Sequence, residues 1–281
     1  MPKLSAITSD NPILLVGCGK MGSAMLSGWL KRKLDGAAIH IVDPNIEHVK
    51  AEFKNFDDRQ LHNSFETISR KIKPSFIILA VKPQMMDDVM EALKINRVSG
   101  DVIVSVAAGR TIRYFEDHIS RDQAIIRAMP NTPAAIGRGI TVCCANRLVS
   151  VDKREVCTLL LQAVGMVEWI EDESLMDAVT ALSGSGPAYV FAMVEAMASA
   201  GEAIGLDPEL SRRLARETVC GSGALLDQSK ELASKLRENV TSPGGTTAAA
   251  LDVLMADDGI FRIMRRAMQD AKARSKELAG S

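Results

Sequence analysis

The sequence has few of the side chains that usually carry proton transfer. Only four of its 281 residues are histidines, and aromatic residues make up 4% of the chain. All four histidines lie before residue 119, at positions His40, His48, His62 and His118. The second half of the chain therefore has no histidine of its own to serve as a general base. We expect the histidines on polar surface, and no close pairing in the sequence predicts a metal site.

The chain also lacks an excess of charge of either sign. Lysine plus arginine total 34 and aspartate plus glutamate total 35, so the formal net charge is −1. Binding to a phosphate backbone needs a surplus of basic residues, so nucleic acid is not the expected partner. Hydrophobic residues account for 47% of the chain and charged residues for 25%, a composition typical of a globular protein rather than a disordered one.

Signatures of disulfides, secretion and membrane spans are missing as well. The cysteines are odd in number and form no CxxC pair, and we expect buried free thiols of a reducing compartment at Cys18, Cys143, Cys144, Cys157 and Cys220. The first twelve residues lack the apolar core of a signal peptide. The longest apolar stretch, residues 187–206, is interrupted by Glu195 and Glu202, which are costly inside a bilayer. A cytoplasmic protein without a membrane span is expected.

The length predicts about two domains. Up to residue 170, short apolar or β-branched runs alternate with segments of helical period, a pattern typical of an α/β Rossmann-type domain with a parallel sheet. The expected strands are Ile13–Val16, Ile39–Val42, Phe76–Val81, Val102–Ala107, Ala124–Ala128, Thr141–Cys144 and Met166–Ile170. No β-rich run follows. We therefore expect a nucleotide-binding domain over residues 1–172 and an all-helical domain over residues 173–281.

Three proline-containing segments predict helix starts in the second domain. These are Pro187 after a Ser/Gly cluster, Asp207-Pro208, and the turn Ser242-Pro243-Gly244-Gly245. The helix over residues 187–206 is apolar nearly all round, so it needs cover on every side. A domain of this size can scarcely supply that cover, and we expect a second subunit to do so.

A glycine-rich motif directly follows the first expected strand. Gly17-Cys18-Gly19-Lys20-Met21-Gly22 fits G-x-G-x-x-G at the mouth of a helix expected to run to about Lys33. In this pattern the first glycine permits a tight turn, the second lets the backbone approach a pyrophosphate, and the third allows close helix–strand packing. The motif could in isolation be a turn that needs small residues, but its position between strand and helix predicts dinucleotide binding.

The second expected strand ends at Asp43, 21 residues after Gly22, where an acid would accept hydrogen bonds from the adenosine ribose. No arginine follows in Pro44-Asn45-Ile46, so the residues favour NADH over NADPH. A capping aspartate before Pro44 is the alternative. Two further strand ends carry loops suited to a cofactor, or to ordinary packing: Ala80-Val81-Lys82-Pro83 and Val106-Ala107-Ala108-Gly109.

The segment Ser242-Pro243-Gly244-Gly245-Thr246-Thr247 combines a turn with three hydroxyl residues at a helix start. Its backbone N–H groups and hydroxyls could bind a small anion such as a carboxylate. The alternative is a plain helix N-cap by Thr246 or Ser242. Serine hydrolysis is disfavoured, because neither Ser185 nor Ser222 lies in a G-x-S-x-G sequence after a strand.

Together these residues resemble one family, the Δ1-pyrroline-5-carboxylate reductases. The resemblance runs from about Ile13 to Leu278 and rests on motifs in the same order along the chain. They are Gly17–Gly22, Ala80–Pro83, Met129-Pro130-Asn131-Thr132-Pro133, Ser183-Gly184-Ser185-Gly186-Pro187-Ala188-Tyr189, Val240–Thr247, Phe261-Arg262 and Arg274-Ser275-Lys276-Glu277-Leu278.

The resemblance implies reduction of 1-pyrroline-5-carboxylate to L-proline by NADPH or NADH. It implies a Rossmann domain joined to a helical dimerisation domain, with dimers assembled into a larger ring such as a decamer. Cofactor contacts would fall on Gly17, Cys18, Gly19, Lys20, Met21, Gly22, Asp43, Asn63, Ala80, Val81, Lys82, Pro83, Val106, Ala107 and Ala108. The substrate would be held by Ser242, Gly244, Gly245, Thr246 and Thr247. Many members prefer NADPH and have a smaller or neutral residue at the position of Asp43, so both cofactors stay open.

The expected chemistry agrees with the scarcity of titratable side chains. A cyclic imine can take its proton from solvent, so hydride transfer to it needs orientation more than a strong protein acid. The Thr247 hydroxyl would hydrogen-bond the ring nitrogen. A β-hydroxyacid dehydrogenase or ketopantoate-type reductase would need a lysine early in the helical domain, and none lies between Lys153 and Lys230. A non-catalytic NAD(H)-sensing protein is the remaining alternative.

Overall fold

The computed structural model describes residues 4–54 and 56–280. Within this part of the chain, one compact unit covers the residues up to Gly184 together with those from Lys272 onward, and a second covers Ser185–Ala271. The first unit is an α/β domain and the second is entirely helical. The division at residues 172 and 173 stays a prediction.

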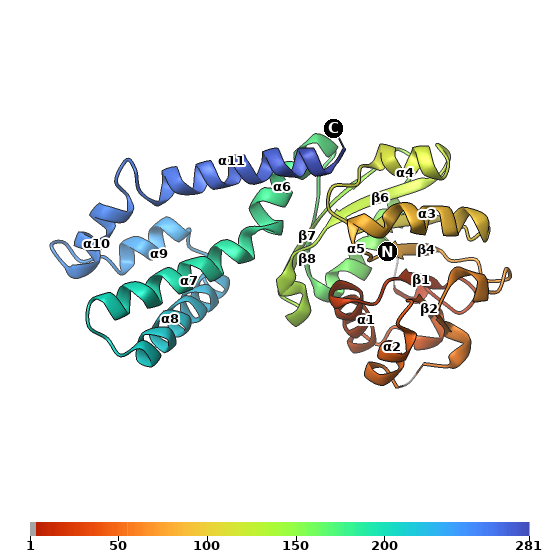
Figure 1. Ribbon diagram of the computed structural model, residues 1–281, viewed down its shortest axis with the longest axis horizontal. Helices are drawn as coiled ribbons and strands as arrows, with labels where there is room; N and C mark the ends of the chain where they lie inside the picture. Colours follow the sequence, from red (N-terminus) through yellow and green to blue (C-terminus); the bar gives the residue numbers. More distant parts are fainter. Residues whose placement is uncertain (1–3, 55, 281) are drawn as a thin grey trace. The chain divides into compact units, whose positions relative to one another are not determined.

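The first unit is built around one mixed sheet, visible edge-on between helices in Figure 1. Among the described residues it has eight strands in the order β3-β2-β1-β4-β5-β6-β7-β8. The strands are β1 (Ile13–Val16), β2 (Ile39–Val42), β3 (Leu61–His62), β4 (Phe76–Leu79), β5 (Val102–Ser105), β6 (Ala124–Met129), β7 (Gly139–Ala145) and β8 (Gly165–Trp169). From β1 the chain adds β2 and β3 on one side and then returns to add β4 on the other side. The switch point of the strand order therefore lies between β1 and β4, the place where doubly wound sheets bind ligands.

The sheet departs from the sequence-based expectation in two ways. β7 runs antiparallel to β6, with Arg127 opposite Cys144, whereas every other neighbouring pair is parallel. β7 follows β6 through a short 3-10 turn at Thr132–Ile136 rather than through a crossover helix, and such a short connection returns the chain antiparallel. The two-residue strand β3 was not expected at all, because two residues show no periodicity.

Side chains of the central strands alternate between two cores. On β1, Ile13 and Leu15 pack into one cluster and Leu14 and Val16 into the other, as strand geometry requires. Helices α1 (Lys20–Lys31), α2 (Ile46–Glu52) and α5 (Val151–Leu161) cover the first cluster. Helices α3 (Met86–Ile95), α4 (Ile112–His118) and α6 (Met176–Val179) cover the second. The strands are therefore buried on both faces, which leaves their carboxyl ends as the exposed edge for a site.

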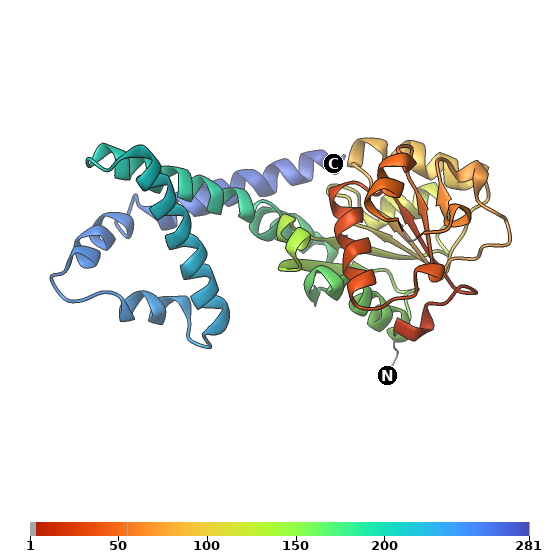
Figure 2. The ribbon, with the colours of Figure 1, turned by 90° about the horizontal axis from the view of Figure 1, so that it is seen from below.

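The helical unit has almost no core of its own. It contains α7 (Gly186–Ala203), α8 (Pro208–Gln228), α9 (Ala233–Asn239), α10 (Thr246–Leu254) and the first part of α11 (Ile260–Leu278). All of Ser185–Ala271 is described, and only Ala198, Ser211 and Ala215 are buried there. α7 and α8 pack as a hairpin, whereas α9 and α10 stand apart from α7 in Figure 2.

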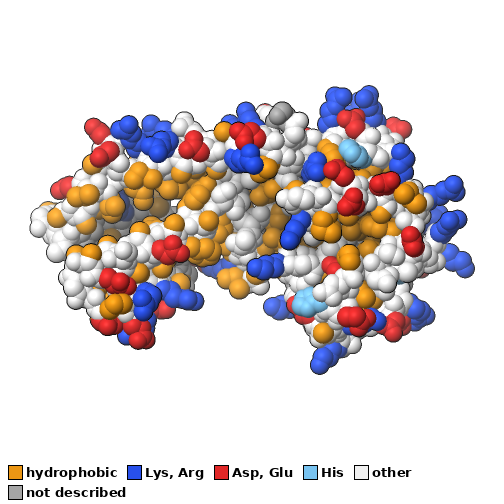
Figure 3. Space-filling model, in the orientation of Figure 1, with side chains coloured by type: hydrophobic (Ala, Val, Ile, Leu, Met, Phe, Trp, Pro, Cys, Tyr) orange, Lys and Arg blue, Asp and Glu red, His pale blue; other side chains and the backbone are white. Residues whose placement is uncertain are grey.

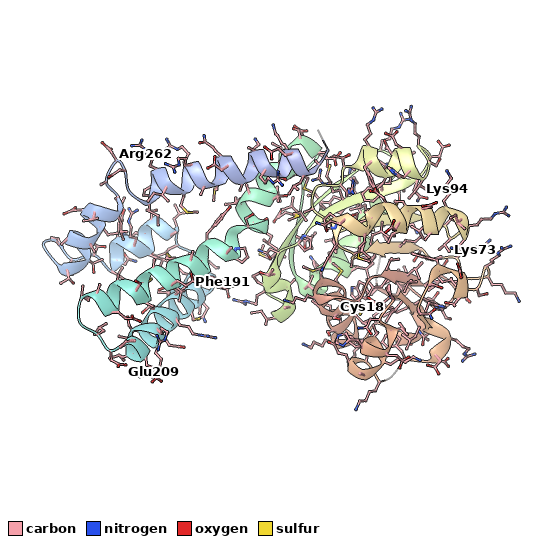
Figure 4. The ribbon with its side chains drawn as sticks, in the orientation of Figure 1. Cys18, Lys73, Lys94, Phe191, Glu209 and Arg262 are labelled. Carbon is pink, nitrogen blue, oxygen red and sulfur yellow. The ribbon has the colours of Figure 1, made fainter. Side chains whose placement is uncertain are left out.

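Large apolar side chains are exposed along this unit. On α7, Phe191 is 62% exposed and Val190, Met193 and Met197 are also exposed. Figure 3 shows hydrophobic side chains gathered over these helices, and Figure 4 labels Phe191. The expectation that α7 needs more cover than its own domain provides agrees with this exposure, since a single chain leaves its faces open to water.

Two further expectations can be compared with the fold. Among the described residues, no helix is long and apolar enough to cross a membrane.

All five cysteines are free; Cys18, Cys143, Cys144 and Cys157 are buried as expected, but Cys220 on α8 is exposed. The expectation of burial was wrong for Cys220 because α8 packs on one side only.

Candidate functional site

The glycine motif forms a tight loop between β1 and α1, beside the labelled Cys18 in Figure 4. Gly17 has a φ of +88°, and a Cβ there would lie 2.8 Å from the Ala80 carbonyl oxygen. A Cβ on Gly22 would lie 2.2 Å from the Gly17 carbonyl oxygen. Both positions therefore require glycine for the fold itself, the first for its backbone conformation and the second for close packing.

Gly19 is different because nothing in the protein requires its missing side chain. A Cβ on Gly19 would meet no atom within 4 Å. Gly19 is also the N-cap of α1, and no side chain caps that helix or places an acid in its first turn. No side chain therefore caps the N–H groups of the first turn, and a helix N-terminus of this kind attracts an anion.

The Ser23 side chain, next to the motif, contacts Cys18 within it. The Ser23 hydroxyl donates to the Cys18 carbonyl at 2.9 Å and lies 3.5 Å from the Cys18 sulfur. Burial raises the pKa of the Cys18 thiol to about 11, which keeps the sulfur uncharged near the expected phosphate position. The sequence analysis missed Ser23; a hydroxyl residue directly after the last glycine was the available signal.

Asp43 lies at the carboxyl end of β2 with both carboxylate oxygens in use. One oxygen accepts a hydrogen bond from the Cys18 N–H at 2.7 Å, and the other accepts one from the Asn45 N–H at 2.8 Å. The second contact is the local turn expected of an aspartate before Pro44, while the first ties Asp43 to the glycine loop. Asn63 lies next to it, because the Asp43 N–H donates to the carbonyl of His62. Asn63 itself is exposed.

The loops after β4 and β5 meet at the same edge of the sheet. The Ala80 N–H donates to the Val16 carbonyl, and the Val106 N–H donates to the Leu79 carbonyl, so both loops continue the pairing of their strands. Lys82 is exposed and Pro83 begins a 3-10 turn, Pro83–Met85. Ala107 is 4% exposed, so it offers a ligand little surface of its own. The fifteen predicted cofactor residues thus lie after the carboxyl ends of β1, β2, β3, β4 and β5, twelve of them in the loops and Lys20, Met21 and Gly22 in the first turn of α1.

The histidines beside this edge do not follow the prediction. His62 is only 5% exposed, and its Nε2 lies 3.3 Å from Nδ1 of His40 on the neighbouring strand. Burial, followed by the charge of His62, lowers the pKa of His40 to about 4, and burial lowers the pKa of His62 as well. The expectation of a surface position was therefore wrong for His62, and His40 is only partly exposed. The pairing depends on β3, which gave no signal in the sequence.

The predicted substrate residues form one turn at the start of α10, within the helical unit. The Gly245 N–H donates to the Ser242 carbonyl at 3.0 Å, and Gly244 has a φ of +69°, as expected at the third position of a type II turn that follows proline. The N-cap of α10 is Gly245, and no side chain caps the helix. The alternative of a plain cap by Ser242 or Thr246 was wrong. Ser242 and Thr246 are exposed, and Thr247 is half-buried.

Neither a serine nucleophile nor a metal centre is supported. The Ser183 hydroxyl donates to the Val179 carbonyl within a π-helical turn, and helix rather than strand precedes Ser185. Across the described part of the chain, no group of three or more histidine, cysteine, aspartate or glutamate side chains could hold a metal ion. The glycine loop remains, and its open space at Gly19 and uncapped helix fit a dinucleotide pyrophosphate.

Comparisons with known proteins agree with this geometry. A family model described as pyrroline-5-carboxylate reductase dimerisation matches residues 173–278, and one described as NADP oxidoreductase, coenzyme F420-dependent, matches residues 12–109. The chain is 39% identical to pyrroline-5-carboxylate reductase of Haemophilus influenzae over 267 residues, 95% of this chain and 97% of that protein.

Solved structures give the same result. A pyrroline-5-carboxylate reductase from Coxiella burnetii superposes with a TM-score of 0.84 at 31% identity and covers 96% of this chain and 99% of its own. The Plasmodium falciparum pyrroline carboxylate reductase, solved with NADP bound, has a TM-score of 0.77 at 27% identity, with 97% and 99% covered. The chain belongs to the pyrroline-5-carboxylate reductase family.

Proposed function

We propose that this protein catalyses the NAD(P)H-dependent reduction of 1-pyrroline-5-carboxylate to L-proline, the last step of proline biosynthesis. One observation carries the proposal beyond family membership. The chain has both an open, uncapped glycine loop suited to a dinucleotide and an uncapped, hydroxyl-lined turn suited to a carboxylate. A protein that only senses NAD(H) would need the first of these features but not the second.

The cofactor is proposed to lie across the carboxyl edge of the sheet. Its pyrophosphate would lie on the Gly17–Gly22 loop and be bound by the N–H groups from Gly19 onward, because those of Gly17 and Cys18 donate to the Val42 carbonyl and to Asp43. Its adenosine ribose would be bound by Asp43 and Asn63. The backbone of Ala80–Pro83 and Val106–Ala108 would contact the rest of the molecule. When bound, NAD(P)H supplies the hydride that reduces the C=N bond.

Asp43 supports NADH as the preferred cofactor. Its carboxylate is fixed by two backbone N–H groups, so it cannot easily turn away from a 2′-phosphate. Two cations that follow in the sequence are engaged elsewhere: Lys50 lies 3.3 Å from Glu47 and 3.1 Å from Asp58, and Arg59 pairs with Asp57. A 2′-phosphate would therefore meet a negative charge without these cations to offset it.

The ratio of kcat/KM for NADH to that for NADPH tests this preference. We expect Asp43→Ser to shift the ratio toward NADPH by about tenfold or more, which corresponds to about 1.4 kcal/mol. Asp35→Ser is a matched control, because Asp35 caps a turn before the start of β2. A wild-type enzyme that strongly prefers NADPH would remove the ribose role of Asp43.

The substrate carboxylate is proposed to bind at the turn before α10. Ser242 and the N–H groups of Gly244, Thr246 and Thr247 offer the donors, and the positive end of the helix dipole adds to them. The Gly245 N–H closes the turn by donating to the Ser242 carbonyl. The exposed hydroxyls of Ser242 and Thr246 do not cap the helix, so a ligand can use them.

Thr247 is proposed to orient the ring of the substrate. Its hydroxyl would hydrogen-bond the ring nitrogen, which takes its proton from solvent, so no strong acid is needed at this position. Thr247→Ala should lower kcat/KM by about 1–3 kcal/mol, the size of one hydrogen bond to a charged group. Thr247→Ser keeps the hydroxyl and should stay close to wild type. Equal kinetics for the alanine and wild-type enzymes would remove Thr247 from the mechanism.

The protein is proposed to be a homo-oligomer, in which dimers form through the helical unit and assemble into a decamer. The exposed apolar side chains of α7 and the near absence of a core in Ser185–Ala271 support the dimer. Light scattering after size exclusion should give the mass of ten chains of 30.3 kDa. Phe191→Asp should lower that mass. A wild-type protein that elutes as a monomer would contradict the proposal.

A cytoplasmic location is also proposed. The support is the set of four buried free thiols, which is typical of proteins kept in a reducing compartment.

A further inference from the structure

One arginine joins the two loops that follow β4 and β5. Arg110 comes directly after Gly109, which has a φ of +73°, and directly before Thr111, the N-cap of α4. Its Nη2 donates to the carbonyl oxygen of Pro83 at 3.1 Å. That carbonyl also accepts the Met86 N–H of its own 3-10 turn, so Arg110 supplies its second hydrogen bond. The contact connects a residue of the Ala80–Pro83 loop to the end of the Val106–Gly109 loop.

The guanidinium group is held from three directions. Besides the Pro83 carbonyl, its Nη2 lies 3.3 Å from a carboxylate oxygen of Asp87 in the first turn of α3. Its Cζ lies 4.5 Å from the centre of the Tyr114 ring on α4. The Tyr114 hydroxyl donates to the other oxygen of Asp87, which closes the arrangement. The hydrogen bond from Tyr114 and the charge of Arg110 both lower the pKa of Asp87, so the carboxylate stays ionised.

The ion pair between Arg110 and Asp87 is too exposed to contribute much to global stability. The side chain of Asp87 is 61% exposed and that of Arg110 is 24% exposed, and exposed ion pairs contribute little to the free energy of unfolding. The geometry is more specific than an ordinary surface pair, because a planar guanidinium bonds a backbone carbonyl and a carboxylate while stacked on a ring. What this arrangement fixes is the position of the Pro83 peptide relative to the loop after β5.

We propose that Arg110 is a positioning residue for the dinucleotide: it sets the spacing of the two candidate cofactor loops, Ala80–Pro83 and Val106–Ala108. This rests on the proposed function, in which both loops contact the cofactor. Arg110 itself touches neither cofactor nor substrate in this account. Asp87 and Tyr114 act through Arg110 by holding its guanidinium group over the Pro83 carbonyl.

Replacement of Arg110 by methionine keeps most of the length of the side chain and removes the guanidinium group. Arg110→Met should weaken NADH binding about tenfold in a fluorescence titration and raise the KM for NADH similarly. The KM for pyrroline-5-carboxylate should stay within twofold, and the melting temperature should change little because the contact is on the surface. Arg110→Lys should recover part of the affinity, since an ammonium group keeps the charge but lacks the planar group that stacks on the Tyr114 ring.

A second pair of variants tests whether Asp87 acts through Arg110. Asp87→Asn should weaken NADH binding less than Arg110→Met does, and the double variant should be no weaker than Arg110→Met alone. Arg113→Met is the matched control: it lies on α4, the helix that follows Arg110, and its pair with Asp117 is exposed. The control should bind NADH as the wild type does.

The outcomes separate this inference from the proposed reaction. NADH affinity of Arg110→Met within twofold of wild type would overturn the positioning role, and so would a loss of affinity that only accompanies a large fall in melting temperature. A wild-type protein that binds NADH but does not reduce pyrroline-5-carboxylate would overturn the proposed reaction. The NADH titration of Arg110→Met would still decide the role of Arg110 in that case. If the wild type binds no dinucleotide, both fail.

Discussion

Substitution of Gly19 by alanine separates ligand binding from folding. Gly19 has φ −72° and ψ −161°, a conformation that alanine adopts without strain. The added Cβ would meet no protein atom within 4 Å, so the folded chain gains no clash. Alanine lowers the entropy of the unfolded chain but is a poorer N-cap than glycine, and these two effects oppose each other. We therefore expect the free energy of unfolding to change by less than about 1 kcal/mol.

Binding of NADH should respond much more strongly. A methyl group at Gly19 would fill the space through which a pyrophosphate approaches the first turn of α1. Loss of one hydrogen bond between an N–H group and a charged phosphate costs about 1.5–3 kcal/mol, which is about 10- to 150-fold in Kd. The decrease should appear in a fluorescence titration with NADH, alongside an unchanged thermal denaturation curve.

Alanine variants of two other glycines serve as controls for this measurement. In Gly22→Ala the new Cβ would lie 2.2 Å from a backbone oxygen, so both stability and binding should fall. In Gly36→Ala the nearest atom is a side-chain carbon of Leu30 at 4.0 Å, so neither should fall. A Gly19→Ala protein that binds NADH within twofold of wild type would refute the conclusion that the ligand passes over Gly19.

Three further predictions concern stability in the first unit. Gly28→Ala should cost about 1–3 kcal/mol of unfolding free energy without changing NADH affinity, because its Cβ would lie 2.5 Å from the Ala163 carbonyl oxygen. Glu173→Ala should cost about 3 kcal/mol in urea denaturation, because the same carboxylate oxygen accepts from the buried Arg127 and from the Ile112 N–H, each at 2.9 Å; Glu173→Gln should cost less. His40 favours its neutral form in the folded state, so stability should fall as pH drops from about 6.5 toward 4, and His40→Gln should flatten that dependence between pH 7 and pH 5.

Each of these has an outcome that contradicts it. Wild-type stability for Gly28→Ala would mean that α1 can shift away from Ala163. No loss of stability in either the alanine or the glutamine variant of Glu173 would mean that the charge on Arg127 needs no partner. An unchanged pH dependence in His40→Gln would assign the acid sensitivity to other groups.

The sequence predicted best those strands whose apolar run is followed directly by a residue that does not fit a strand. The observed β1 and β2 match the expected bounds, because a glycine and an aspartate follow their apolar runs directly. The strand expected over Phe76–Val81 ends at Leu79, since small residues that leave the sheet look the same in sequence as residues within it. The reversed direction of β7 could not be inferred at all, because periodicity carries no information about strand direction.

In the candidate site, too, some features could be predicted from the sequence and others could not. The glycine loop was predictable because a backbone requirement restricts the residue type to glycine at Gly17 and Gly22. The contact between Arg110 and Pro83 was not, because it joins residues far apart in the sequence that meet only when β4 and β5 pair. The sequence left a cap and an anion site as alternatives at Ser242–Thr247, and only the backbone geometry excluded the cap.

The central claim is that this chain reduces a cyclic imine. The direct measurement follows loss of NADH or NADPH absorbance with pyrroline-5-carboxylate as substrate and identifies the product by chromatography. We predict one L-proline formed for each reduced cofactor consumed, and no cofactor reduction when 3-hydroxyacids are supplied with NAD⁺ or NADP⁺. Absence of L-proline in an enzyme that binds NADH, or turnover of 3-hydroxyacids instead, would contradict the account.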